Sequence, residues 1–182
     1  MILHGNDARQ KILEGINLVA NTVKPTLGPQ ARTAILQGNP PVVINDGVTI
    51  SKYVSSNDPY VQMGVQLVQN LASKAQSKAG DGTTTACVLA QALCNNISEE
   101  ALQNITSTRQ ILQNDRDTII RNLDKYSKPV KDEDIGKIAT IASNNDEQLG
   151  SIIAEVFKEV GRDGKTKGCE PNNTIKHKET SK

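Results

Sequence analysis

Apolar residues recur every three or four positions along most of this chain, which is the spacing of one face of an α-helix. The pattern predicts helices over residues 6–23, 58–78, 83–94, 108–126, 132–143 and 145–160, with a shorter helix from Asp46 to Val54. Asp58-Pro59 is typical of a helix start, because Asp caps free N–H groups and Pro fits the first turn. The predicted fold class is mainly α.

Two β-branched runs, residues 33–36 and 42–44, are joined through Gly38-Asn39-Pro40-Pro41 and predict a small β-hairpin. Residues 83–94 are apolar or small on every side, which predicts a central, buried helix. Ser127-Lys128-Pro129 indicates a boundary, because the residue before a proline disfavours helix. Residues 165–182 are rich in Lys, Thr and Asn and are expected to be disordered.

Composition and charge narrow the classes of partner. Aromatic residues make up 2% of the 182 residues, which argues against a nucleic-acid binder that stacks bases on aromatic rings. Lys plus Arg total 21 and Asp plus Glu total 20, so the nearly neutral net charge gives no sign of a surface that binds a polyanion. No apolar run is long enough to span a membrane, and the N-terminus lacks the apolar core of a signal peptide. We expect a protein of the cytoplasm, or of an organelle matrix.

The three cysteines carry little chemical information. Cys87 and Cys94 are separated by six residues, a poor spacing for zinc, and the third cysteine, Cys169, is distant in sequence. Small core residues are a better interpretation of these cysteines than a metal–thiolate site.

The most informative stretch is Ala79-Gly80-Asp81-Gly82-Thr83-Thr84-Thr85-Ala86, in which two glycines flank an aspartate before a helix. The first turn of a helix has unpaired N–H groups and the positive end of the dipole, where phosphate binds readily. The hydroxyls add donors, and Asp81 is placed to hold a divalent cation. A helix cap after a glycine turn accounts for the pattern equally well, and the sequence lacks the G-K-[ST] ending of a Walker A loop.

Two further stretches gain meaning only in combination. Thr26-Leu27-Gly28-Pro29 is a turn after a helix, and most such turns have no other role. Asn45-Asp46-Gly47-Val48-Thr49 offers a second acid that can act near a metal, although N-D-G by itself is most often a tight turn.

Four motifs, G-N-D-A-R, T-L-G-P-x-x-R, D-G-V-T-I and A-G-D-G-T-T-T-A, follow one another in this order. With residues 135–152, they make the chain resemble, over residues 4–164, the N-terminal part of the group I chaperonin family (chaperonin 60, GroEL-like). The resemblance implies half of a helical equatorial, ATP-binding domain with a small hairpin at residues 1–128. It implies the first intermediate-domain helices at 129–164, followed by a divergent tail at 165–182.

The resemblance also assigns roles by position. It implies ATP, Mg²⁺ and K⁺ as ligands, with Asp81 as the magnesium ligand and Asp46 as a supporting catalytic acid beside the metal and the attacking water. Asn45 falls at a nucleotide or potassium contact where group I members usually have Lys. Ala31 replaces the usual glycine of the first loop and would be strained if that position required a positive φ. The implied nucleotide-binding set is Thr26, Leu27, Gly28, Pro29, Asn45, Asp81, Gly82, Thr83, Thr84 and Thr85.

Family members are several-fold longer than this chain. The chain resembles none of the apical domain, which in the family binds unfolded polypeptide and a co-chaperonin. It also lacks the second intermediate segment, which carries the family's catalytic aspartate, and the second equatorial half, which completes the adenine and ribose pocket. A truncated gene, a shifted reading frame and an expression boundary each explain the difference.

The resemblance implies ATP-dependent folding of unfolded polypeptides by a homo-oligomeric ring, with this chain as a truncated or divergent member. Two alternatives stay open, a non-enzymatic protein-binding fragment (a holdase or interaction module) and a decayed fragment without a present function. Whether the chain is itself an enzyme is equally open, because the family's catalytic aspartate lies outside the matching part.

Overall fold

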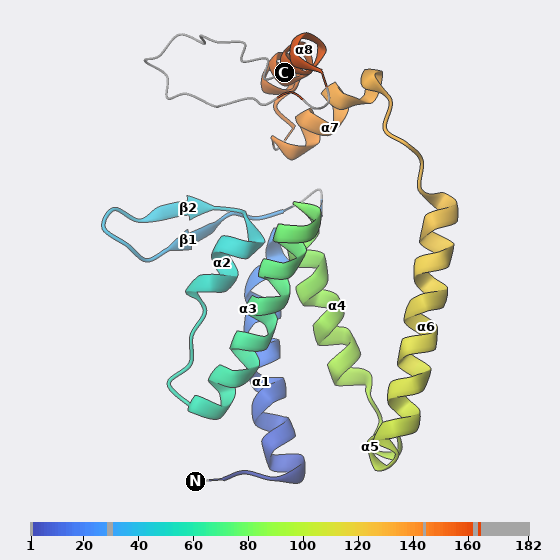
Figure 1. Ribbon diagram of the computed structural model, residues 1–182. Coiled ribbons are helices and arrows are strands. Elements are labelled where there is room, and N and C mark those ends of the chain that lie inside the picture. The colour runs from blue at the N-terminus through green and yellow to red at the C-terminus, as the bar shows by residue number, and fades with distance from the viewer. Residues whose placement is uncertain (1, 29–30, 144, 162–163, 165–182) are drawn as a thin grey trace. The chain divides into compact units, whose positions relative to one another are not determined.

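The computed structural model describes residues 2–28, 31–143, 145–161 and 164. The chain divides into two compact units, Met1–Ile111 and Leu112–Lys182, with the division inside a long helix. The described residues are mostly helical with one two-stranded sheet, which confirms the predicted fold class (Figure 1). None of the helices in this described part is both long and apolar enough to cross a membrane.

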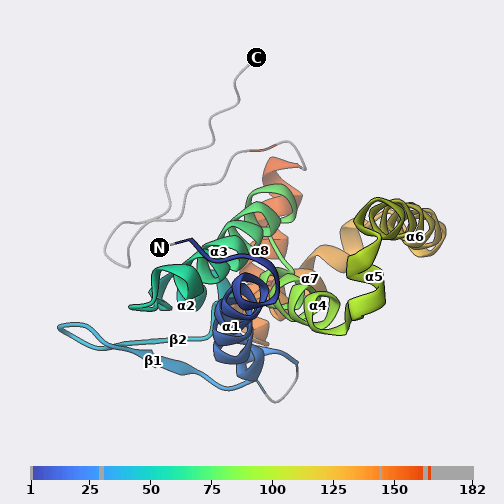
Figure 2. The same ribbon diagram turned by 90° about the horizontal axis from the view of Figure 1, so that it is seen from below.

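The first unit is built around two helices, α1 (Gly5–Val23) and α3 (Pro59–Ala79), which lie side by side (Figures 1 and 2). They approach so closely that a Cβ atom added to Gly15 would overlap the backbone carbonyl of Val61, and one added to Gly64 would overlap that of Ile12. Glycine is needed at this crossing because any side chain would push the two backbones apart.

A 3-10 turn, a hairpin and two further helices pack around this pair. The 3-10 turn η1 (Lys24–Thr26) extends α1, strands β1 (Ala34–Leu36) and β2 (Val42–Ile44) form the antiparallel hairpin, and α2 (Gly47–Tyr53) and α4 (Thr83–Asn96) pack on α3. Ala34 is paired with Ile44 and Leu36 with Val42. The connected core contains Ile16, Val19, Val23, Leu36, Val48, Ile50, Val65, Val68, Ala72 and Cys87.

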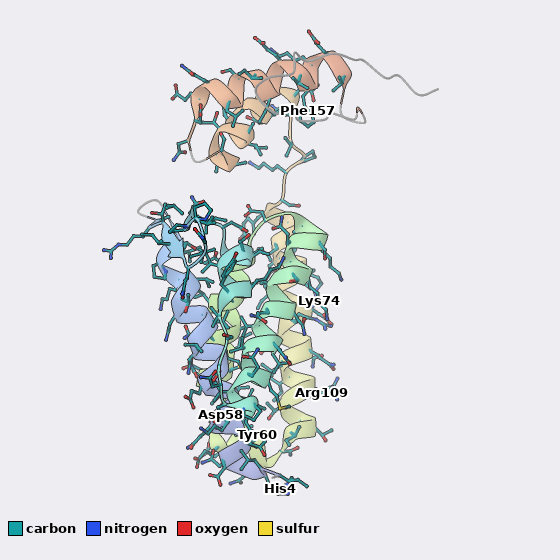
Figure 3. The ribbon with its side chains drawn as sticks, turned by 90° about the vertical axis from the view of Figure 1, so that its left-hand side faces the viewer. His4, Asp58, Tyr60, Lys74, Arg109 and Phe157 are labelled. Atoms are coloured by element: carbon teal, nitrogen blue, oxygen red, sulfur yellow. The ribbon has the colours of Figure 1, made fainter. Side chains whose placement is uncertain are left out.

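The start of α3 is fixed to α1 by charge. The Asp58 side chain accepts a hydrogen bond from the Tyr60 backbone N–H at 2.9 Å, and its other oxygen lies 2.8 Å from Lys11 Nζ. Figure 3 labels Asp58 and Tyr60 at this end of α3 and Lys74 further along the same helix. The Lys11 side chain and charge lower the pKa of Asp58, with help from the Tyr60 N–H. The predicted helix start at Asp58-Pro59 is therefore confirmed.

The prediction of a central, buried helix at residues 83–94 was wrong about its burial. Only Thr83 and Cys87 of α4 are buried, and Leu89 and Leu93 are 57% and 60% exposed. An apolar sequence on every side does not show how many neighbours a helix finds. α4 packs through one side only, mainly against α1 and α3, with α2 and η1 at its first turn.

The chain leaves the first unit through α5 (Glu99–Gln103), which the periodicity did not predict, and α6 (Ile105–Tyr126). The second unit contains η2 (Asp132–Asp134) and the helix pair α7 (Ile135–Ala142) and α8 (Glu147–Val160). These helices cross at Gly150, where an added Cβ would overlap the Thr140 hydroxyl. The boundaries at residues 128 and 164 stay a prediction, and the tail at 165–182 lies outside the described residues.

Candidate functional site

The predicted phosphate loop lies between α3 and α4. Gly80 ends α3 with φ 72°, and Gly82 precedes α4 with φ 77°, both in the left-handed region that side chains disfavour. Two left-handed glycines reverse the chain here and leave Asp81 exposed between them, with its Oδ1 accepting the Gly82 N–H at 2.6 Å. The N-cap of α4 is Gly82, which has no side chain to cap the first turn, so the N–H groups of that turn can meet an anion.

The three threonines on that first turn differ in environment. Thr83 is buried at 7% exposure, Thr84 is half-buried and Thr85 is exposed. The Thr26 hydroxyl donates to the Val23 carbonyl at 2.7 Å and lies 3.4 Å from the Thr84 hydroxyl. Either hydroxyl can be the donor in this contact. This hydrogen bond joins the turn after α1 to the first turn of α4.

A third segment meets the same threonine. A Cβ atom added to Gly47 would overlap the Thr84 hydroxyl oxygen and would lie 3.3 Å from that of Thr83. The N-terminal end of α2 therefore rests directly against the first turn of α4. Sequence reasoning placed Gly47 at a turn and at the start of a short helix but gave it no contact with Thr84, because a contact between segments so distant in the chain leaves no local signal.

Asp46 is the capping residue of α2. One of its carboxylate oxygens accepts the Val48 N–H at 3.3 Å, and the other accepts the Thr49 N–H at 2.9 Å and the Thr49 hydroxyl at 2.5 Å. Burial raises the pKa of Asp46, but the hydrogen bonds from Thr49 and Val48 and the charge of Lys52 together lower it below its ordinary value. Asp46 is thus held ionised and fixed in direction, while remaining exposed enough to reach a ligand.

The loop after α1 supplies the last of the predicted residues. The Leu27 N–H donates to the Lys24 carbonyl at 3.1 Å, and the Arg32 N–H donates to the Pro25 carbonyl at 2.9 Å, which closes the turn around Gly28. Pro29 lies outside the described residues. Ala31 is not strained, because Asn145 is the only described residue other than glycine with a positive φ.

Three segments that are distant in sequence therefore converge at one place in the first unit. The turn after α1 brings Thr26, the end of the hairpin and start of α2 bring the half-buried Asn45 and then Asp46, and the α3–α4 turn brings Asp81 and its threonines. Thr84 contacts each of the other two segments. The contacts of Thr84 bring the Thr26 hydroxyl and the capped start of α2 to the first turn of α4, and Asp81 precedes that turn by two residues.

This donor set fits a phosphate group together with Mg²⁺. Magnesium is usually bound through one or two carboxylates and the oxygens of phosphate and water, rather than by a full protein cage. Among the residues that the structure describes, no three His, Cys, Asp or Glu side chains gather as a complete metal site. Asp81 would hold such an ion, with the threonines and the N–H groups of α4 facing the phosphate.

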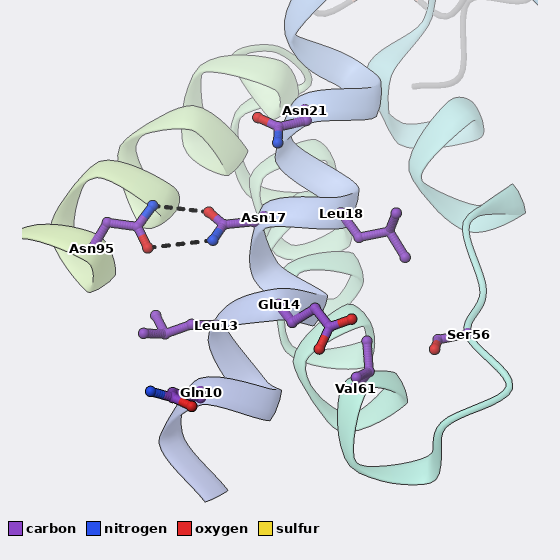
Figure 4. Close-up of a pocket in the computed structure, with 9 residues that line it drawn as sticks. All are labelled: Gln10, Leu13, Glu14, Asn17, Leu18, Asn21, Ser56, Val61 and Asn95. Atoms are coloured by element: carbon purple, nitrogen blue, oxygen red, sulfur yellow. Dashed lines mark hydrogen bonds between the residues drawn. The ribbon is translucent and has the colours of Figure 1, made fainter. Parts of the chain in front are cut away.

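A separate hollow of about 540 Å³ lies along α1, bordered by α4 and by the segment around Ser56 (Figure 4). Its most regular feature is an amide pair, in which Asn95 Nδ2 donates to Asn17 Oδ1 at 2.8 Å and Asn17 Nδ2 donates back at 3.4 Å. The residues that line this hollow include none of the predicted site residues.

Comparison with known proteins agrees with the resemblance seen in the motifs. Residues 19–181 match the TCP-1/cpn60 chaperonin family. A curated relative, the Chaperonin GroEL of Methanospirillum hungatei, is 42% identical over 171 residues, which is 90% of this chain and 31% of the relative. The chain thus spans about a third of the length of that relative.

Solved structures share the same fold. The chaperonin gp146 from the bacteriophage EL 2 (Pseudomonas aeruginosa), crystallised in the presence of ATP-BeFx, has a TM-score of 0.73 and 24% identity, over 89% of this chain and 30% of that one. A group III chaperonin in the open state has a TM-score of 0.64 and 26% identity, over 86% of this chain and 32% of that one.

Proposed function

The chain belongs to the TCP-1/cpn60 chaperonin family, and we propose that it provides the phosphate- and magnesium-binding part of a chaperonin ATP site. The observation that carries the proposal is the convergence of Thr26, Gly47 and Thr84 at the uncapped start of α4. In the whole protein, this site would serve ATP-dependent folding of unfolded polypeptides by a ring of identical subunits, a process that we place in the cytoplasm.

The roles of the residues follow from their chemistry. The α4 N–H groups and the Thr83, Thr84 and Thr85 hydroxyls bind phosphate oxygens, and Asp81 holds Mg²⁺. Asp46, kept ionised by its hydrogen bonds, orients a water molecule near the ion. Leu27, Gly28 and Pro29 cover the nucleotide, and Asn45 contacts the nucleotide or K⁺. Bound Mg²⁺ would supply charge neutralisation for phosphoryl transfer.

Binding by the 182-residue chain alone should be weak. The residues present contact phosphate and metal but supply no acid matching the family's catalytic aspartate, so we expect no steady phosphate release. Calorimetric titration with ATP and magnesium should give millimolar or weaker affinity, a free energy of about 4 kcal/mol or less. Our proposal includes no co-chaperonin contact for these residues, because in the family the apical domain binds the co-chaperonin.

Asp81→Ala tests the assignment, and Asp124→Ala, which removes an exposed carboxylate on α6, is the matched control. We expect Asp81→Ala to abolish binding and Asp124→Ala to leave it unchanged. Equal binding by the wild type and Asp81→Ala would refute the metal assignment. Micromolar binding by the wild type would show that this part of the site is sufficient without the rest.

A second function, holding unfolded polypeptides without ATP turnover, is supported by exposed apolar side chains. Leu67 and Leu89 of the first unit are more than half exposed, although the neighbouring Val65 and Val68 are buried. Suppression of light scattering from an aggregating substrate, equal with and without ATP, would favour this function. No suppression at any ratio would exclude it.

A further inference from the structure

The short helix α2 is held at its C-terminal end by one side chain from α3. Gln69 Nε2 donates to the Ser51 carbonyl at 2.8 Å and to the Val54 carbonyl at 3.0 Å. These carbonyls belong to the last turn of α2 and its C-cap, where a helix leaves acceptors without partners. The Ser51 carbonyl also accepts the Val54 N–H at 3.2 Å, so Gln69 adds a second donor there and reaches the C-cap carbonyl of Val54 as well.

The opposite end of α2 is the end that enters the candidate site. Asp46 caps it and Gly47 rests against the Thr84 hydroxyl. With seven residues, α2 is about 10 Å long and too short to be stable as an isolated helix. Buried Val48 and Ile50 attach its side to the core, and Gln69 attaches its far end.

We propose that Gln69 is a positioning residue, which fixes α2 against α3 and thereby sets where Asp46 and Gly47 meet the first turn of α4. This inference rests on the proposed function, because the position of Asp46 and Gly47 matters only if they form part of a site for phosphate and metal. Both side-chain hydrogen bonds of Gln69 within the described part of the chain go to the end of α2 and its C-cap, so Gln69 would act on the site through α2.

A neighbouring contact supports a holding role for this face of α3. The Ser56 N–H donates to Gln62 Oε1 at 2.8 Å, and Gln62 precedes Gln69 by two turns of the same helix. Two glutamines therefore hold the end of α2 and the segment that follows it. Gln62 accepts while Gln69 only donates, so the two contacts have different chemical requirements.

Both Gln69 contacts use its N–H donors. Substitutions at this position can therefore test whether the donor or only the size of the side chain matters. Gln69→Leu keeps the approximate volume and removes both hydrogen bonds. Gln69→Lys keeps a long donor that can reach the same carbonyls. Gln66→Leu makes the same chemical change at an exposed position of the same helix, and Val68→Ala weakens the core of that helix without touching α2 carbonyls.

Amide hydrogen exchange in the full 182-residue chain gives the first measurement. In Gln69→Leu, the Val48 and Thr49 amides, which donate to Asp46, should exchange roughly tenfold faster. The reason is that α2 loses its attachment to α3 at the C-terminal end and opens more often as a whole. Gln69→Lys should restore slow exchange, and Gln66→Leu should match the wild type. Val68→Ala should lower the melting temperature without a selective effect on these two amides. Unchanged exchange in Gln69→Leu, or the same selective effect in Val68→Ala, would overturn the inference.

A nuclear magnetic resonance titration with ATP and magnesium gives the second measurement. Gln69→Leu should weaken binding about threefold to tenfold, as expected for a displaced binding group. The loss should disappear when Asp46→Ala is already present, because Gln69 acts through that end of α2. An equal loss in both backgrounds would overturn the positioning role. If the wild type binds no nucleotide, the proposed function fails, and the exchange measurement still decides whether Gln69 places Asp46.

Discussion

Two long helices of this chain, α3 and α6, have similar lengths and similar sequence patterns but different surroundings. α3 has 21 residues and buries Val61, Gly64, Val65, Val68 and Ala72. α6 has 22 residues and its own apolar stripe, but none of its side chains is buried. The comparison shows that apolar periodicity specifies a helix, whereas burial requires a complementary surface. For α3, that surface is α1, which it approaches through glycine.

The largest expected effect comes from closing that approach. Gly64→Ala should lower the free energy of unfolding by about 3 kcal/mol, because the new methyl group would overlap a backbone carbonyl of α1 that cannot move independently. Gly136→Ala in α7 is the control, since its Cβ would meet only the Ala154 methyl group at 3.3 Å. Urea denaturation would measure both. Equal stability of the two variants would show that the α1–α3 crossing is looser in solution than in this structure.

Truncating one apolar residue on each long helix tests the comparison directly. Val65→Ala should lower the free energy of unfolding by about 2 kcal/mol, because Val65 is fully buried. Ile119→Ala on α6 should change it by less than about 0.5 kcal/mol, because Ile119 is 58% exposed. Thermal unfolding followed by circular dichroism would measure both. A comparable loss at Ile119 would mean that α6 is covered in solution.

The cap of α2 should contribute less than the core. Asp46→Ala should lower the free energy of unfolding by about 1 kcal/mol at neutral pH, the usual contribution of a helix cap. The folded pKa of Asp46 lies below its ordinary value, so its ionised form stabilises the fold above the ordinary carboxyl pKa. That contribution should be lost as the pH falls through the folded pKa. Denaturation at several acidic pH values should therefore bring wild type and Asp46→Ala together, and a constant difference would contradict the assignment.

The smallest effect on stability should come from replacing exposed apolar residues of α6 by lysine. Leu112→Lys and Ile119→Lys should leave the unfolding free energy nearly unchanged, since both side chains are already exposed. They should nevertheless reduce self-association, because large exposed apolar surfaces favour contacts between molecules. Analytical ultracentrifugation would measure this, with Gln113→Lys as a control on the same helix. Unchanged association would show that the apolar stripe of α6 does not mediate it.

Much of the local structure could be predicted from the sequence. Periodicity located α1, α3 and α8 to within a few residues, and the proline-containing connection located the hairpin. It missed α5 and began α6 three residues late, because Glu99–Gln103 is too short to show a period. The glycine and threonine turn at Gly80–Thr85 was correctly seen as the break between two helices.

The sequence by itself determined the helices, the hairpin and the types of side chain at the candidate site, because these depend on neighbours within a few positions of the chain. Only the tertiary structure decided that α4 is covered on one side, that Gly47 meets Thr84, and that Gln69 holds the far end of α2. Such contacts depend on the shapes of surfaces that are distant in sequence. They form only where two backbones can approach closely and each buried donor finds an acceptor.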